Sequence, residues 1–302
     1  MSARLSRGRR AVLALPYLWL LIFFIAPMAL VAKISFSHPA EARPPYEPVF
    51  SLSDGFSGAI EKLRSLNLDA YRAFAEDNLY RDSLVTSLVI AATSTLITLC
   101  IAYPFALAMT RAPARLRPIL VALAVAPFWT SFLIRVYAWI ALLKDEGLIN
   151  HVLTTLGLIQ EPLGIYATNV AVMIGIVYSY LPFMLLPLYS TLERLDPSLG
   201  EAAADLGATP ATVFLRVTLP LSRRGVIAGC LLVFIPAVGE FVIPDLLGGS
   251  DTLMIGRTIW NDFFANRDWP TASAAAMLLL LLLLGPLLLT ERLRLRDERE
   301  NS

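Results

Sequence analysis

The chain has 302 residues, of which 57% are hydrophobic and 16% are charged. Soluble globular domains have about 45–50% apolar and about 25% charged residues, so this composition is typical of a protein embedded in a membrane. With 25 basic and 24 acidic residues the formal net charge is +1, and no basic surface for nucleic acid is expected. The composition argues against a soluble enzyme, a secreted disulfide scaffold and a disordered chain.

Six apolar runs are long enough to cross a bilayer as helices, because the hydrocarbon core requires about 20 residues of helix. They are predicted at roughly 11–35, 84–109, 118–142, 169–191, 225–247 and 272–290. Arginines precede the first run, as in a signal peptide, but a signal core has only about 7–15 apolar residues. We therefore expect an uncleaved first transmembrane helix. Prolines and glycines interrupt several of the runs, which predicts kinked helices.

The distribution of arginine predicts how these spans are oriented. Arginines are concentrated in 1–10, 111–117, 192–224 and 291–302, whereas the alternate connections carry an acidic excess. Positively charged connections stay in the cytoplasm. The sequence therefore predicts an all-α integral membrane protein with six transmembrane helices, a cytoplasmic N-terminus (1–10) and a cytoplasmic tail (291–302).

The longest outer connection is 36–83, between the first two spans. Its first half is rich in proline, serine and glycine, which is typical of a loop. In its second half, 67–82, apolar residues recur at helical spacing. These residues are Leu68, Tyr71, Phe74, Ala75 and Leu79. We expect an amphipathic helix there, lying on the outer surface.

The cytoplasmic connection between the fourth and fifth spans, 192–224, carries clear local signals. Asp196 and Thr209 are good helix N-caps, and each is followed by a proline suited to the first helical position. Gly207 stands where the first helix has to end, a usual place for a left-handed residue. The sequence predicts two short helices that meet at a sharp corner.

The same connection resembles the EAA loop of ABC importer permeases. Glu201-Ala202-Ala203 is followed after three residues by Gly207, and after nine more by Val217-Thr218-Leu219-Pro220. The resemblance implies the type I ABC importer permease fold, with a five-helix core at 84–290, and a loop that docks on a separate ATPase. The ATPase-coupling residues that it implies are Glu201, Ala202, Ala203, Gly207, Leu219 and Pro220. A plain helical connection is the alternative, which the full spacing disfavours.

Flanking stretches narrow the resemblance. Residues 128–139, 181–187 and 232–249 are similar to polyamine permeases, and 254–256 with 266–270 to putrescine permeases in particular. The resemblance implies import of putrescine or spermidine across a bacterial inner membrane. It also implies a second homologous permease, a cytoplasmic ATPase dimer and a periplasmic polyamine-binding protein as partners.

Three ionisable residues fall within or at the rim of the spans: Arg135, Glu240 and Asp245. An Arg or Asp facing lipid costs roughly 2.5–3.5 kcal/mol, so they should face the bundle or a wet path. Carboxylates and aromatic faces along that path would attract a dication. The aromatic candidates are Trp139, Tyr178, Tyr180, Phe183 and Phe241. Alternatively, Arg135 and Glu240 form a structural ion pair, and Asp245 is simply solvated.

The sequence contains no P-loop motif and neither of the hydrolase motifs H-E-x-x-H and G-x-S-x-G. We therefore expect no cofactor, metal or catalytic residue in this chain, with ATP and magnesium bound by the partner ATPase. The rival functions are import of another cationic metabolite such as an opine, secondary transport, and intramembrane catalysis. The EAA loop argues against the last two.

Overall fold

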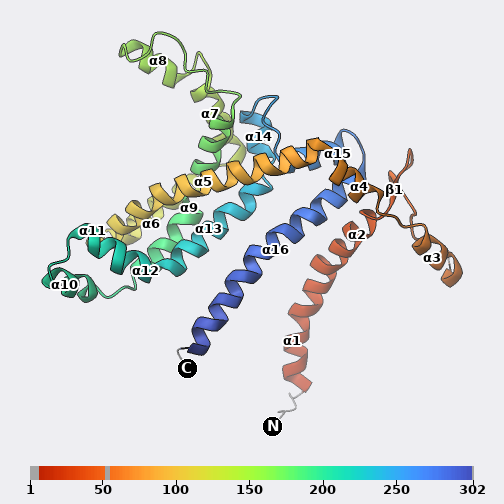
Figure 1. Ribbon diagram of the computed structural model, residues 1–302, viewed down its shortest axis with the longest axis horizontal. Helices are drawn as coiled ribbons and strands as arrows, with labels where there is room; N and C mark the ends of the chain where they lie inside the picture. The colour runs from red at the N-terminus through yellow and green to blue at the C-terminus, as the bar shows by residue number, and fades with distance from the viewer. Residues whose placement is uncertain (1–6, 52–54, 301–302) are drawn as a thin grey trace. The chain divides into compact units, whose positions relative to one another are not determined.

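The computed structural model describes residues 7–51 and 55–300. Within these residues every regular element is helical except one hairpin, in which β1 (His38–Pro39) pairs antiparallel with β2 (Tyr46–Glu47) (Figure 1). The all-α prediction is thereby confirmed for the described part. The predicted terminal segments 1–10 and 291–302 fall partly outside it, since residues 1–6 and 301–302 are not described.

The chain divides into two compact units, one of Met1–Arg81 with Thr258–Ser302 and the other of Asp82–Arg257. In the first unit, α1 (Arg7–Leu20), a π-helical turn η1 (Leu21–Ile25) and α2 (Ala26–Ile34) follow one another without interruption. Helix α16 (Trp269–Glu300) packs against α2 and α4.

The outer connection of the first unit is more helical than predicted. Helix α3 (Gly55–Arg64) lies in the part expected to be a loop. The predicted amphipathic helix exists as α4 (Asp69–Glu76) but ends before the extended Asp77, and the residues after it already belong to α5 (Asn78–Arg111). Serine and glycine near α3 are typical of a loop. The helix itself is too short for apolar residues at helical spacing to be recognised in the sequence.

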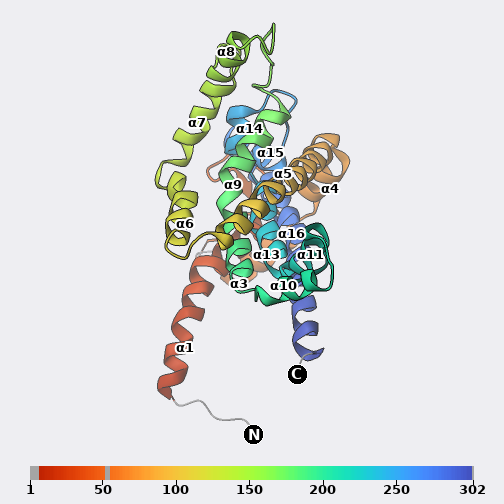
Figure 2. The ribbon, with the colours of Figure 1, turned by 90° about the vertical axis from the view of Figure 1, so that its left-hand side faces the viewer.

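The second unit holds most of the remaining helices. After α5 come α6 (Arg117–Val125), a 3₁₀ turn η2 (Ala126–Trp129), α7 (Phe132–Leu143), α8 (Leu148–Thr155) and α9 (Asn169–Leu192). They are followed by α10 (Ser198–Asp205), α11 (Pro210–Val213), a π-helical turn η3 (Phe214–Thr218), α12 (Leu219–Leu221), α13 (Arg223–Val238), α14 (Val242–Leu247) and α15 (Ile255–Phe264). Figure 2 shows α7 leading directly into α8.

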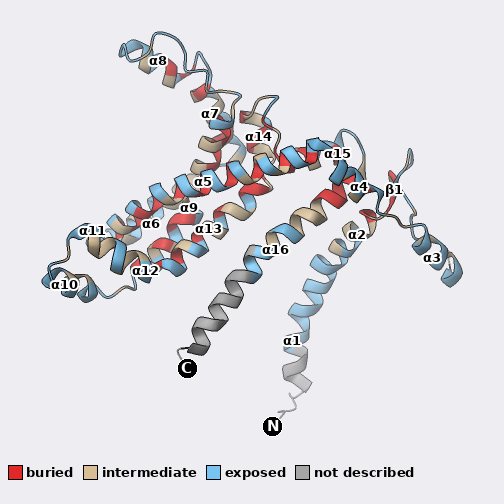
Figure 3. Ribbon diagram, viewed as in Figure 1, coloured by how far each residue is buried: buried red, intermediate tan, exposed pale blue. Residues whose placement is uncertain are grey.

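The core of this unit lies where α9 and α13 run side by side, and buried residues recur along both helices (Figure 3). Glycines allow the close approach. A Cβ on Gly229 would lie 2.6 Å from Met184 Sδ, and one on Gly225 would lie 2.5 Å from Thr191 Oγ1. Helix α5 adds Tyr103 and its buried neighbours to the same core.

Only part of the predicted set of six spans is unbroken. By length and composition three helices can cross a membrane, 14–34, 78–111 and 169–192, and two bent pairs raise the number to as many as five within the described residues. The helix predicted at 118–142 is broken after Trp129 and bends by 86°, and the one predicted at 225–247 stops at Val238. The sixth prediction corresponds to the shorter apolar stretch Trp269–Gly285 of α16. Proline supplies no amide hydrogen, so Pro127 weakens the helix just before the first break.

Gly256 offers a test of how tightly the second break is packed. A Cβ there would lie 2.4 Å from the Gly239 carbonyl oxygen and 2.6 Å from that of Glu240, and both are backbone atoms that cannot rotate away. Gly256→Ala should destabilise the protein by about 1–3 kcal/mol, as overpacking usually does. Thermal unfolding in detergent measures the loss. Gly285→Ala is the control, because a Cβ there meets nothing within 4 Å. Equal melting temperatures for the two variants would contradict the packing described.

Candidate functional site

The connection 192–224 forms the predicted corner of two short helices, α10 and α11. Asp196 Oδ1 accepts a hydrogen bond from the Ser198 amide at 3.0 Å, which holds the pKa of the Asp196 carboxyl below its usual value. Helix α10 starts at Ser198, one residue later than predicted. Thr209 Oγ1 accepts from the Thr212 amide at 3.3 Å, as expected of an N-cap. Gly207 has φ +87°, in the left-handed region, so the predicted stop of the first helix is confirmed.

The corner exposes apolar side chains that its own packing leaves uncovered. Leu206, immediately before Gly207, is 90% exposed, and Leu199 is also exposed. Of the predicted coupling residues, Glu201, Ala202, Gly207 and Pro220 are exposed, and Ala203 and Leu219 are half-buried. Leu206 was not predicted as a site residue, although a leucine next to a helix-ending glycine in a polar connection is a detectable signal. An exposed corner of this kind suits contact with another protein.

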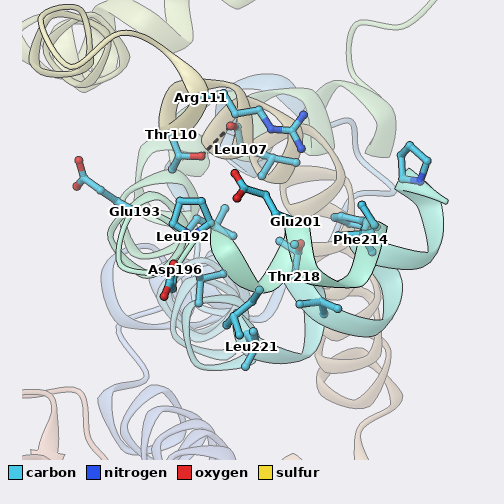
Figure 4. Close-up of a pocket in the computed structure, with 18 of the residues that line it drawn as sticks. Leu107, Thr110, Arg111, Leu192, Glu193, Asp196, Glu201, Phe214, Thr218 and Leu221 are labelled. Atoms are coloured by element: carbon cyan, nitrogen blue, oxygen red, sulfur yellow. Dashed lines mark hydrogen bonds between the residues drawn. The ribbon is translucent and has the colours of Figure 1, made fainter. Parts of the chain in front are cut away.

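Behind α10 lies a pocket of about 610 Å³, lined by the ends of α5, α6 and α9 and by α10 to α12. Figure 4 shows the Glu201 side chain entering it on the side of Thr110 and Arg111. At its rim, Arg117 Nη1 lies 3.7 Å from Glu193 Oε1. The pocket lies between α10 and the ends of α5, α6 and α9.

Tyr103 ties the connection to α5. Its hydroxyl lies 2.6 Å from Ser222 Oγ, and its ring packs edge-on against Phe214 with centroids 5.3 Å apart. Tyr103 is buried, so both contacts are shielded from water. A displacement of η3 would therefore reach α5 directly. The sequence analysis missed Tyr103 because nothing distinguishes one tyrosine within a long apolar run.

Two of the residues predicted to line a path, Arg135 and Glu240, contact the backbone at the two helix breaks. Arg135 lies over the ring of Phe128 at 4.5 Å and over that of Phe132 at 5.9 Å, and Nη1 donates to the Pro127 carbonyl at 3.1 Å. Its side chain is buried within the unit, with 9% of the residue exposed.

Glu240 lies at the other break, between α13 and α14. Its Oε1 accepts from the amides of Val242 at 3.0 Å and Ile243 at 3.4 Å, and its Oε2 accepts from the Tyr180 hydroxyl at 2.5 Å. Only 8% of the residue is exposed. The two charged residues therefore have separate partners, and the ion pair considered as an alternative is not formed in this structure.

Two groups of rings occupy the space between α7 and α9. Phe183 packs against Phe128 with centroids 5.4 Å apart and against Tyr180 at 6.0 Å. Trp139 and Tyr178 form a second pair, edge to face at 5.5 Å.

Asp245 and Phe241 were also predicted to line the path. Asp245 pairs with Arg257, with Oδ1 3.2 Å from Nε, and more than half of its side chain is exposed. Phe241 is half-buried at the break itself. Among the described residues there is no group of three or more His, Cys, Asp or Glu side chains that suits a metal ion.

Comparison with known proteins gives a consistent result. The family model described as binding-protein-dependent transport system inner membrane component matches residues 7–290. The spermidine/putrescine transport system permease protein PotB of Haemophilus influenzae is 39% identical over 89% of this chain and 88% of its own length. Its counterpart in Escherichia coli is 46% identical over 66% of this chain and 72% of its own.

A likeness to a solved structure shows the fold. A chain of a bacterial alginate ABC transporter, crystallised in complex with an alginate pentasaccharide-bound periplasmic protein, superposes with a TM-score of 0.73. The match covers 95% of this chain and 94% of that chain at 16% sequence identity.

Proposed function

The chain belongs to the family of inner membrane components of binding-protein-dependent transport systems, and we propose that it is the permease subunit of an ATP-driven polyamine importer. The observation that carries the proposal is the exposed corner at Gly207, held by two capped helices and connected through Tyr103 to α5. A separate ATPase would press on this corner, and the long helices would follow.

The cargo is inferred from the relatives and from chemistry. Relatives whose names state spermidine/putrescine transport align with most of this chain. A polyamine carries several positive charges, and aromatic faces attract each of them by about 0.5–2 kcal/mol. Glu240 is buried and hydrogen-bonded to Tyr180, and Arg135 to Pro127. The cargo path that we propose therefore follows ring faces and the carboxylate of Asp245, which is more than half exposed although it pairs with Arg257. The ring faces are those of Trp139, Tyr178, Phe183 and Phe241.

The partners that we propose follow from family membership. They are a second homologous permease, a cytoplasmic ATPase dimer that binds ATP and magnesium, and a periplasmic polyamine-binding protein. The many apolar side chains exposed along α1 and α16 suit lipid or a neighbouring helix. Six spans with both termini in the cytoplasm would place α10 on the side of the ATPase.

The orientation is tested by cysteine labelling in intact cells. Both native cysteines, Cys100 and Cys230, lie in apolar helices and are first replaced by alanine. An impermeant thiol reagent added outside should label Gln160→Cys and should fail to label Asp205→Cys, although both positions are exposed in the chain. Permeabilised cells should show labelling at both. Labelling of Asp205→Cys from outside would reverse the orientation and remove the ATPase from the corner.

Coupling is tested by replacing each of two glycines in the segment 192–224 with alanine, one as the test and one as the control. Gly207→Ala forces a side chain into the left-handed region at a cost of about 1–2 kcal/mol, or about five- to thirtyfold in a conformational equilibrium. Gly200→Ala meets only Val213 Cγ1 at 3.6 Å and is the control. In the purified importer, Gly207→Ala should retain ATP hydrolysis but lose at least about fivefold in uptake. If uptake per ATP is the same in both variants, the corner does not couple.

Cargo class is tested by competition in proteoliposomes that contain the complete importer. Unlabelled putrescine or spermidine should suppress uptake of labelled putrescine, whereas 1,4-butanediol, which has the same carbon chain but no charge, should not. An opine that competes better than either polyamine would move the assignment to another cationic metabolite.

A further inference from the structure

Both charged residues buried in the membrane-embedded part of Asp82–Arg257 lie at helix breaks. A break leaves carbonyl groups unpaired on one side and amide groups unpaired on the other. Within a bilayer no water can satisfy them, so each unpaired group costs several kcal/mol. Glu240 accepts from unpaired amides at one break, and Arg135 donates to a backbone carbonyl at the other.

Arg135 contacts the carbonyl end of the helical segment that precedes the first break. The Pro127 carbonyl accepts from the Thr130 amide at 3.3 Å, from Thr130 Oγ1 at 2.7 Å and from Arg135 Nη1 at 3.1 Å. The guanidinium also covers the face of Phe128, which compensates for part of its lost hydration. The cation thus adds a charged donor to the carbonyl group at which the 3₁₀ turn before the break ends.

Glu240 serves the amide side of the second break. Its Oε1 takes the two first free amides of α14, those of Val242 and Ile243. Its Oε2 is held by the Tyr180 hydroxyl from α9. Backbone packing seals the other side, because Gly256 lies directly against the carbonyls of residues 239 and 240. Three donors and near-complete burial leave little of the carboxylate for a passing cation.

The two breaks are joined by side chains. Phe183 on α9 contacts Phe128 beside Arg135 and Tyr180 beside Glu240, so an unbroken series of contacts runs from one break to the other. Helix α14 also packs against both α7 and α9. A shift at either break therefore moves the rings that hold the other.

We propose that Arg135 and Glu240 are positioning residues that cap the two breaks, and that Phe128, Phe183 and Tyr180 make the two broken helices move together. Neither charge contacts the cargo. This proposal rests on the proposed function in one respect, namely that the joint movement of the two broken helices is part of transport. The contacts themselves do not depend on which cargo is carried.

Hydrogen exchange of the assembled importer in lipid nanodiscs, without cargo or ATP, tests the capping. Glu240→Ala should speed exchange of the amides in 241–247 by about tenfold, as for loss of a buried hydrogen bond. Glu240→Gln should stay within about threefold, because its carbonyl oxygen still accepts from both amides. In uptake assays the rate of polyamine uptake should likewise be severalfold higher for Glu240→Gln than for Glu240→Ala. Equal losses of uptake in these two variants would show that the charge itself is needed and would overturn the capping role.

A matched pair on α9 tests the connection. Phe183→Leu removes the ring that joins the breaks, and at 41% exposure this residue tolerates the change. Exchange should rise by at least about threefold in both 128–135 and 241–247. Tyr178→Leu, which disrupts only the pair with Trp139, should leave 241–247 within about twofold of wild type. If Phe183→Leu leaves 241–247 unchanged, the breaks are independent. Failure of polyamine uptake in the wild-type importer would refute the proposed function and leave these exchange results valid.

Discussion

A helix that breaks inside a bilayer must find partners for the backbone groups it frees, because lipid offers none. This constraint accounts for the charges in the second unit. Glu240 accepts from two amides that the second break frees, and Arg135 adds a donor to the Pro127 carbonyl at the first break. Both charged residues, which would be costly facing lipid, are therefore stabilised by backbone groups at the breaks. The breaks are built features of the fold, held by hydrogen bonds and by tight glycine packing.

The other end of the unit carries the corner on which we propose that a partner ATPase docks. The corner at Gly207 is exposed, and a pocket lies between α10 and the long helices. Tyr103, bonded to Ser222 and packed on Phe214, fixes the far end of the same connection to α5. The coupling that we propose would act through these two features, the exposed corner at one end of the connection and the buried Tyr103 contacts at the other.

Much of this arrangement could be predicted from the sequence where short-range chemistry decides it. Gly207 and Thr209 do what a glycine at a helix end and a threonine before a proline do, and the family resemblance located the connection. Prolines and glycines predicted kinks in the apolar runs, and Pro127 and Gly239 do lie beside the two breaks. The sequence could not show which of the many prolines and glycines would stand at a full break. Opposite charges suggested that Arg135 and Glu240 pair with each other. In the structure each of the two residues instead has hydrogen-bond partners at the break beside it. Those partners come together only in the folded chain.

The central claim is that ATP hydrolysis in a partner ATPase drives transport by this chain. The resulting movement reaches the chain through the segment 192–224. Proteoliposomes that contain the permeases, the ATPases and the binding protein decide it most directly. Polyamine uptake should require ATP on the ATPase side, should stop with a non-hydrolysable analogue, and should not respond to an imposed ion gradient. Uptake driven by an ion gradient through the permeases alone, without ATPases, would contradict the account and identify a secondary transporter.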